Sequence, residues 1–256
     1  MHAVRLSQLT KWFDEKLAVD HLDLEVEEGE FFGFLGPNGA GKSTTIKMLC
    51  GLLQPDFGRA EVLGMDVLSQ PLDVRRLIGV LPEEVSLYER LTPIELLRFT
   101  GRLHGLGRAE VDQRADRLLD LMELEPGDRR KMILDFSMGM RKKVSLACAL
   151  IHGPRLVFLD EPFNGIDAVT IRAIRHVLQD AVARGVTIFF SSHILELVEK
   201  LCTKTAIITQ GRLRVCGTLD DIRAQAGFDQ SASLEDVFVG LAGGDRATGG
   251  GLEFLG

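Results

Sequence analysis

One short segment constrains the fold of this chain more than any other part of its sequence. It follows the spacing G-x-x-x-x-G-K-S, and its residues are Gly36, Pro37, Asn38, Gly39, Ala40, Gly41, Lys42 and Ser43, followed by Thr44. A continuous apolar run over residues 31–35 precedes it, which is typical of a buried strand. The apolar residues Ile46, Leu49 and Leu53 follow at helical spacing. A strand, a glycine-rich loop and a helix, in this order, form the context in which this spacing binds phosphate.

The chemistry of the segment predicts a nucleoside triphosphate as its ligand, together with Mg²⁺. Glycines let the backbone wrap closely around phosphate groups. The first turn of the helix adds unpaired N–H donors and a partial positive charge. Lys42 can reach the β- and γ-phosphates, and Ser43 can ligate Mg²⁺. We therefore expect the segment from Gly36 to Thr44 to hold the phosphate chain of a nucleotide.

Two carboxylates and a histidine follow later apolar strands. Asp160 and Glu161 come directly after the apolar run over residues 156–159, and His193 follows another such run. In a parallel sheet, ligands lie at the carboxyl edge of the strands. We expect Asp160 to orient Mg²⁺, either directly or through a water molecule, and Glu161 to act as the general base for an attacking water. His193, at the same edge, could contact the γ-phosphate and that water.

The distribution of apolar residues predicts one α/β domain over residues 1–242, with a helical insertion in its middle. Alternating apolar and polar residues in the first thirty positions indicate half-buried antiparallel strands. Residues from about 84 to 152 have the spacing of consecutive helices separated by polar turns, and strands and helices alternate after them. The glycine-rich segment 243–256 is expected to be a flexible tail.

Charge and patterning argue against several other kinds of protein. The net charge of -7 speaks against nucleic acid as a partner, because phosphate backbones bind basic surfaces. No apolar run approaches the roughly 18 residues needed to span a bilayer, and the first residues do not resemble a signal peptide. We therefore expect the chain to stay in the cytoplasm. The four cysteines form no C-x-x-C pair, which argues against a zinc site.

A segment about one helix before the two carboxylates narrows the assignment. Residues 136–143 have the sequence FSMGMRKK, which resembles the LSGGQ signature of ABC ATPases. Ser137 and Gly139 are kept, whereas Met138 and Met140 stand in place of a glycine and the glutamine. A serine hydroxyl and the N–H groups at the start of a helix can bind phosphate. The chemistry of the signature is therefore retained despite the two methionines.

With the phosphate loop, this segment, the carboxylates and the histidine in the family's order, the chain resembles the ATP-binding subunits of ABC transporters over roughly residues 3–240. The resemblance implies a P-loop NTPase fold: a RecA-like parallel sheet, an N-terminal antiparallel β subdomain and an inserted helical subdomain. It implies that Phe13 stacks on the adenine of ATP, although the neighbouring Trp12 could do so instead. It also implies that Glu83, at the position of the family's glutamine, ligates Mg²⁺ and that Asp167 lies at a dimer interface.

The same resemblance implies partners. Bound ATP would hold two chains head to tail, with Ser137 and Gly139 of one chain binding the γ-phosphate held by the other. The assembly would be either a homodimer or a heterodimer with a second ATPase subunit. A separate transmembrane permease would move the substrate, and this chain would lie on the cytoplasmic side of the membrane as a peripheral subunit. Residues 87–92, 217–219 and 233–238 resemble the single-domain ATPases of bacterial exporters, which implies export.

Several other classes of protein share parts of this pattern. ABC ATPases of DNA repair carry long coiled coils or zinc insertions, those of translation usually carry two cassettes in one chain, and GTPases carry N-K-x-D. The sequence shows none of these features. A regulator that binds ATP without hydrolysing it stays open as an alternative, because Glu83 and the signature depart from the family's usual residues.

Overall fold

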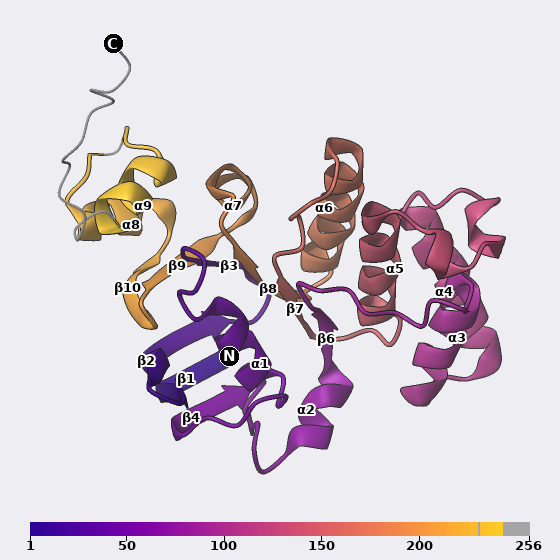
Figure 1. Ribbon diagram of the computed structural model, residues 1–256, viewed down its shortest axis with the longest axis horizontal. Helices are drawn as coiled ribbons and strands as arrows, with labels where there is room; N and C mark the ends of the chain where they lie inside the picture. The colour runs from indigo at the N-terminus through magenta and orange to yellow at the C-terminus, as the bar shows by residue number, and fades with distance from the viewer. Residues whose placement is uncertain (230, 243–256) are drawn as a thin grey trace.

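The computed structural model describes residues 1–229 and 231–242, and it contains two β-sheets flanked by helices (Figure 1). The larger sheet has the strand order β10-β9-β3-β8-β7-β6. Its strands are β3 (Phe31–Leu35), β6 (Ile78–Leu81), β7 (Leu156–Asp160), β8 (Thr187–Ser192), β9 (Lys204–Thr209) and β10 (Arg212–Gly217). The smaller sheet has the order β2-β1-β4-β5 and consists of β1 (His2–Phe13), β2 (Lys16–Glu27), β4 (Phe57–Val62) and β5 (Met65–Asp66). The predicted α/β fold with an N-terminal antiparallel sheet is confirmed.

The larger sheet is parallel from β6 to β9, and only β10 pairs antiparallel to its neighbour. Strands β3, β7 and β8 are buried along their whole length. Residues 31–35, 156–159 and 188–190 of these strands carry no polar side chain, because both faces of a parallel sheet are covered by other elements. The register places Leu35 beside Ser192 and Asp160 beside Ser191. The carboxyl ends of these three strands therefore lie side by side, next to the loop that leads into α1 (Lys42–Leu49).

The smaller sheet packs one apolar face against the larger one. Strands β1 and β2 pair antiparallel, and their buried residues alternate with exposed ones over much of their length. The buried side chains of β1 and β2 share a hydrophobic core with Phe32 and Phe34 of β3 and with Ile46 of α1. This core joins the hairpin of β1 and β2 to the phosphate loop, and it explains the alternation that predicted half-buried strands.

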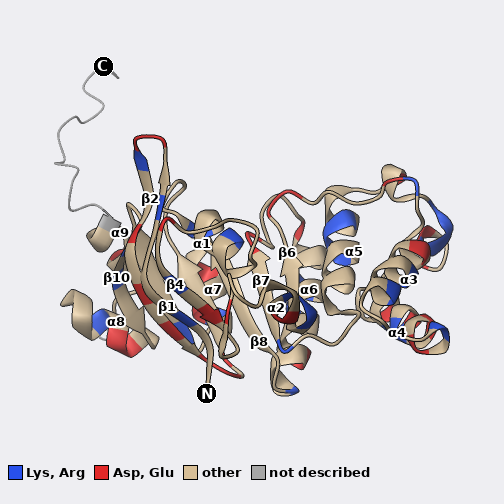
Figure 2. Cartoon of the chain, turned by 90° about the horizontal axis from the view of Figure 1, so that it is seen from below, with Lys and Arg blue, Asp and Glu red and all other residues tan. Residues whose placement is uncertain are grey.

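The central part of the chain forms the predicted consecutive helices. They are α3 (Pro93–Leu103), α4 (Arg108–Leu121) and α5 (Met138–Leu150), with the short 3₁₀ turns Asp128–Arg130 and Ile133–Asp135 between them. Helix α3 begins at a capping box, in which Thr92 accepts from the backbone of Glu95 and Glu95 accepts from the backbone of Thr92. These helices lie at the end of the molecule opposite β2 (Figure 1). Both signs of charge are mixed over α3 and α4 (Figure 2).

Short elements were harder to predict than long ones. The predicted alternation of strands and helices after residue 152 includes the long helix α6 (Ala168–Ala183). Helices α2 (Pro71–Leu77), α7 (Leu195–Leu201), α8 (Leu219–Ala226) and α9 (Leu234–Ala242) were not predicted, because seven to nine residues give only about two turns of periodicity. Among the described residues, no helix has the length and apolarity to cross a membrane. The tail predicted over 243–256 lies outside the described residues.

Candidate nucleotide site

The phosphate loop between β3 and α1 depends on its glycines. A Cβ atom at Gly36 would lie 2.6 Å from the carbonyl oxygen of Ile208, and one at Gly41 would lie 2.4 Å from that of Ala18. Gly41 also has a φ of 102°, a left-handed conformation that favours glycine. The first N–H groups of α1 have no acceptor within the helix, and its first turn carries no acidic residue. The loop therefore presents backbone donors and a partial positive charge to an anion.

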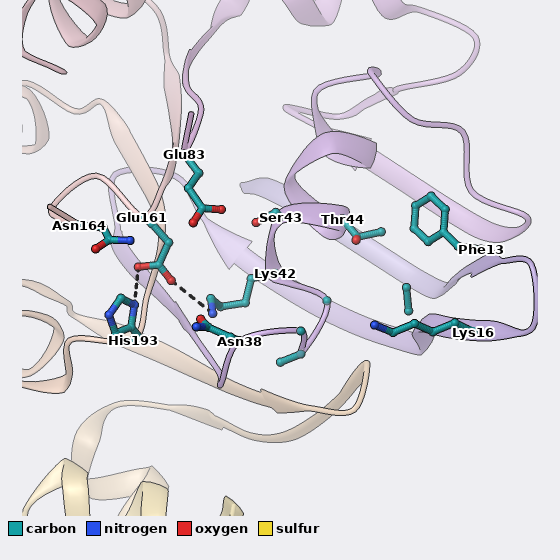
Figure 3. A pocket seen from close by; sticks show the side chains of 14 residues that line it. Phe13, Lys16, Asn38, Lys42, Ser43, Thr44, Glu83, Glu161, Asn164 and His193 are labelled. Atoms are coloured by element: carbon teal, nitrogen blue, oxygen red, sulfur yellow. Dashed lines mark hydrogen bonds and ion pairs between the residues drawn. The ribbon is translucent and has the colours of Figure 1, made fainter. Parts of the chain in front are cut away.

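A cavity of about 630 Å³ opens in front of this loop (Figure 3). Most of the predicted site residues meet there. The cavity is lined by Phe13, Lys16, Ala18, Asn38, Gly39, Ala40, Gly41, Lys42, Ser43, Thr44, Glu83, Glu161, Asn164 and His193. The loop, the hairpin of β1 and β2, and the ends of β6, β7 and β8 all contribute to it. Its mixture of N–H donors, two lysines and two carboxylates suits a phosphate chain with a divalent cation.

At the centre of the cavity, three side chains lie close together. Nζ of Lys42 lies 3.3 Å from Oε1 of Glu161, and Nδ1 of His193 lies 2.9 Å from Oε2 of the same carboxylate. The side chains of Lys42 and Glu161 are 6% and 5% exposed, whereas that of His193 is 44% exposed. Lys42 also donates to the carbonyl oxygen of Gly36 at 2.7 Å. Figure 3 shows Glu161 lying between Lys42 and His193.

One oxygen of Glu161 provides a test of whether the cavity fits its expected contents. Oε1 is buried and faces the Lys42 ammonium at 3.3 Å, but it accepts no hydrogen bond within the described part of the chain. A buried carboxylate oxygen that accepts no hydrogen bond is costly, so a group that donates to it inside the cavity would be stabilised. A water molecule placed between Oε1 and a bound phosphate would supply that donor. The residues present therefore fit a nucleotide and an attacking water.

The backbone at Glu161 is strained, and Asp160 lies behind it. Glu161 has a φ of 46°, in the left-handed region that non-glycine residues seldom adopt. Its N–H donates to Oγ of Ser191 at 3.0 Å, and that hydroxyl donates to Oδ1 of Asp160 at 2.6 Å. Asp160 is buried and is not part of the cavity lining. This position leaves the two predicted modes for Asp160, direct ligation of Mg²⁺ or ligation through water, both open.

The oxygen atoms at this edge fit a hard cation. Ser43 and Glu83 line the cavity, and Asp160 lies at the end of the adjacent strand β7. In the described part of the chain, no cluster of three or more His, Cys, Asp and Glu side chains could hold a metal on its own. Such a set suits Mg²⁺, which is usually bound through one or two carboxylates and the phosphates of the nucleotide.

The hairpin of β1 and β2 forms the end of the cavity that lies away from Lys42 (Figure 3). Phe13 is 47% exposed and lines the cavity, whereas Trp12 has the same exposure and does not line it. Nζ of Lys11 lies over the Phe13 ring, 5.7 Å from its centre, and forms a cation–π contact with it. Lys16 faces Phe13 across the hairpin and also lines the cavity. Of the two aromatic residues considered from the sequence, the geometry favours Phe13.

Some cavity residues were missed and some predicted residues lie elsewhere. Lys16, Ala18 and Asn164 line the cavity, but the sequence analysis did not single them out. Lys16 and Ala18 follow Phe13 by three and five residues in the same hairpin, and this closeness could have indicated that they line the same cavity. Gly36 and Pro37 belong to the loop without lining the cavity.

The signature residues lie apart from the cavity, with Ser137 exposed and Gly139 buried. Ser137 is the N-cap of α5, and its side chain accepts from the backbone N–H of Met140 at 3.3 Å. A Cβ atom at Gly139 would lie 2.9 Å from Oγ1 of Thr170 and 3.5 Å from Oδ2 of Asp167. Asp167 is exposed and caps α6 by accepting from two backbone N–H groups. None of Ser137, Gly139 and Asp167 lines the cavity.

Comparison with known proteins places these features in one family. The family profile described as ABC transporter matches residues 19–164. The probable multidrug ABC transporter ATP-binding protein YbhF of Escherichia coli is 37% identical over 241 residues, which cover 93% of this chain and 41% of that protein. The bacitracin transport ATP-binding protein BcrA of Bacillus licheniformis is 37% identical over 211 residues, which cover 82% of this chain and 68% of that protein.

A solved structure of an ATP-binding subunit of an ABC transporter has a TM-score of 0.87 and 36% identity to this chain. The match covers 94% of this chain and 99% of that structure. The chain thus spans nearly the whole of that solved subunit but only about two fifths of the length of YbhF.

Proposed function

Because this chain belongs to the ABC transporter family of ATP-binding proteins, we propose that it binds and hydrolyses ATP to drive export through a separate transmembrane subunit. The contacts of the buried Glu161 carboxylate with Lys42 and His193, beside the phosphate loop, carry this proposal. A lysine that reaches the terminal phosphates and a carboxylate that can accept a proton from water are what hydrolysis of the γ-phosphate requires. The relatives named for multidrug and bacitracin transport support a role in transport.

In the proposed reaction, each side chain has one task. Oε1 of Glu161 accepts a proton from the water that attacks the γ-phosphate, and the bond to the departing ADP oxygen breaks. His193 holds the other carboxylate oxygen, and it orients Glu161 toward the water. Lys42 and the N–H groups at the start of α1 compensate the negative charge on the β- and γ-phosphates. Mg²⁺, when bound through Ser43, Glu83 and Asp160, would neutralise charge on the same phosphates.

The adenine of ATP would stack on Phe13, with Lys16 beside it. Both side chains lie at the end of the cavity formed by the hairpin, away from Lys42 (Figure 3). An aromatic ring backed by the Lys11 ammonium offers one face to adenine. The nucleotide would then run from the hairpin along the loop to Glu161.

The active unit would be a dimer. Ser137 and Gly139 lie outside the cavity of their own chain, so they can contact a nucleotide only if a second chain presents one. Ser137 offers a hydroxyl and α5 offers the N–H groups of its first turn, and no acidic side chain lies in that turn. Asp167, exposed at the start of α6 next to Gly139, would lie in the same interface. Either a second copy of this chain or a related ATPase subunit could supply the partner.

We propose that residues 1–242 act as one ATPase domain, into which the helices over about 84–152 are inserted. Glu83 joins the cavity to this insertion, since it follows β6 directly and precedes α3. The insertion would contact a cytoplasmic helix of the permease and would carry the motion caused by ATP binding to it. The chain would then work at the cytoplasmic face of the membrane as a peripheral subunit.

Steady-state ATP hydrolysis by the purified chain with Mg²⁺ tests the proposed activity, with Lys42→Ala as the inactive variant. We expect turnover in the wild type and none in the variant, which loses its contact with the terminal phosphates. Tight ATP binding without turnover, in the presence of the permease as well as alone, would instead support a regulator that only binds ATP.

A further inference from the structure

A lysine on the signature helix contacts the backbone of the glutamate at the centre of the cavity. Lys142 lies in the second turn of α5, which begins just after Ser137, and it is only 2% exposed. Its Nζ atom donates to the carbonyl oxygen of Glu161 at 2.9 Å and to that of Asn164 at 2.8 Å. One buried ammonium therefore joins α5 to two residues that line the nucleotide cavity.

Keeping a charge at this depth is costly. Burial lowers the pKa of Lys142, while the nearby carboxylates of Glu161 and Glu83 act in the opposite direction. An ammonium has three N–H groups to satisfy, and the two carbonyl oxygens accept from it here. An apolar residue of similar length would fill the space at lower cost. The position of the charge therefore suggests a role other than packing.

That role follows from the conformation of Glu161. Its φ of 46° is unfavourable for a residue other than glycine and persists only where the surroundings enforce it. Both backbone polar groups of this residue are bonded: Ser191 accepts from its N–H, and its carbonyl oxygen accepts from Lys142 at 2.9 Å and from the backbone N–H of Asn164 at 3.2 Å. With the two groups fixed, the direction of the Cα–Cβ bond is fixed as well. The carboxylate is thereby held between Lys42 and His193.

The Lys142 ammonium connects two regions of one chain that would face different nucleotides in the proposed dimer. The start of α5 carries Ser137, which would contact the nucleotide held by the second chain, whereas Glu161 faces the nucleotide of its own chain. A displacement of α5 would move the ammonium and, with it, the carbonyl oxygens of Glu161 and Asn164. The contact with Glu161 is short and both residues are buried, so we expect the carbonyl oxygen to follow the ammonium.

We propose that Lys142 is a positioning residue that holds the strained backbone of Glu161 and ties the placement of its carboxylate to the signature helix. This inference rests on the proposed role of Glu161 in ATP hydrolysis. Lys142 touches neither the nucleotide nor the water in this account. Its removal should therefore lower the rate of the chemical step and leave the affinity for ATP largely unchanged.

The test compares Lys142→Met, Lys142→Gln and Lys142→Arg in the full chain, with Lys131→Met as a control. Lys131 is an exposed lysine of the helical insertion that pairs with Asp128. We expect Lys142→Met to lower kcat at least tenfold with the ATP affinity, measured by direct binding, within twofold of the wild type. Lys142→Arg, which keeps the charge and the N–H donors, should recover most of kcat. A crystal structure of Lys142→Met should show Glu161 outside the left-handed region.

Two results would overturn the inference. One is a Lys142→Met variant with more than half of the wild-type kcat, and the other is a loss of kcat matched by an equal loss of ATP affinity. If Lys142→Met does not fold, as judged by thermal unfolding, Lys142→Gln is judged by the same criteria. Wild type and Glu161→Gln are measured alongside. A wild type that is inactive both alone and with the permease would refute the proposed function, and an active Glu161→Gln would refute the role of Glu161 as the base. The Lys142 variants decide this inference separately.

Discussion

The ammonium of Lys42 lies 3.3 Å from Oε1 of Glu161, and both side chains are buried. The lysine that would bind the terminal phosphates is therefore paired with the carboxylate that would act as the base. Binding of ATP has to weaken this pair, because the phosphate oxygens compete with Glu161 for the same ammonium. The free chain thus neutralises two charges that the bound nucleotide would separate.

Replacement of Glu161 by glutamine should change binding and hydrolysis in opposite directions. Glutamine does not compete for Lys42 and cannot accept the proton of the attacking water. We expect ATP affinity equal to or higher than that of the wild type, and a turnover lower by about two to four orders of magnitude, the usual contribution of a general base. Equilibrium ATP binding and steady-state hydrolysis measure the two effects. Near-normal turnover would remove Glu161 from the role of base.

Phe13 and Trp12 should differ in their effect on ATP affinity. Phe13 lines the cavity and Trp12 does not, although both are 47% exposed. Stacking of a base on an aromatic ring contributes about 1–3 kcal/mol, so Phe13→Ala should weaken ATP binding by roughly five- to more than a hundredfold. Trp12→Ala should change it by less than twofold. A larger effect of Trp12→Ala would transfer the stacking role to that residue.

Mixtures of two inactive variants should recover activity if the sites are shared between chains. Ser137→Arg places a bulky cation where the signature would approach the partner's nucleotide, and Lys42→Ala removes phosphate binding. A mixed dimer would contain one site with Lys42 from the first variant and Ser137 from the second, both intact. We expect turnover in the mixture and none in either variant alone. The absence of recovery at every mixing ratio would contradict the shared site.

Two stacked histidines should make stability depend on pH. The rings of His104 and His152 have centroids 3.8 Å apart at an angle of 12°, and Nε2 of His152 lies 3.0 Å from the carbonyl oxygen of Ile78. Burial, with a smaller contribution from the charges of His104 and Arg114, lowers the pKa of His152 from 6.5 to about 4. The folded chain therefore keeps His152 neutral under conditions in which the unfolded chain protonates it.

The direction of this pH dependence follows from the difference in proton binding between the folded and the unfolded chain. Between about pH 6.5 and pH 4 the unfolded chain binds more protons at this position, so the stabilising contribution is complete above about pH 6.5 and is lost as the pH falls. We expect the free energy of unfolding of His152→Gln to fall less steeply over this range than that of the wild type. His176→Gln, at an exposed position of α6, serves as the control. Equal slopes in denaturant unfolding for all three proteins would contradict the assignment.

The sequence predicted the parts of the site that depend on local spacing. The phosphate loop, Asp160 and Glu161 each follow a buried strand directly, and the parallel register brings those strand ends together. The alternation of β1 and β2 and the solid apolar strands also predicted the two sheets, because burial on one face or on two leaves different patterns.

The remaining features depend on contacts between distant parts of the chain. Ser191 and Lys142 are 30 and 19 residues from Glu161, and no spacing in the sequence relates them to it. The left-handed backbone of Glu161 has no sequence signal either, since a glycine would be the expected residue there. Lys16, at the start of β2, and Asn164, in the loop after β7, line the cavity because of where the hairpin and that loop pack. Such positions follow from tertiary packing, which local patterns do not encode.

We propose an ATPase whose sites are completed by a second chain. If this claim is correct, the turnover per chain depends on the chain concentration. Mg²⁺-dependent ATP hydrolysis is measured per chain over several orders of magnitude in concentration, from well below to well above the dimer dissociation constant. We predict that turnover per chain rises steeply with concentration and reaches a plateau, because a single chain holds Glu161 but lacks a partner's Ser137 at its nucleotide. A turnover per chain that stays constant down to the most dilute, demonstrably monomeric sample would contradict the claim.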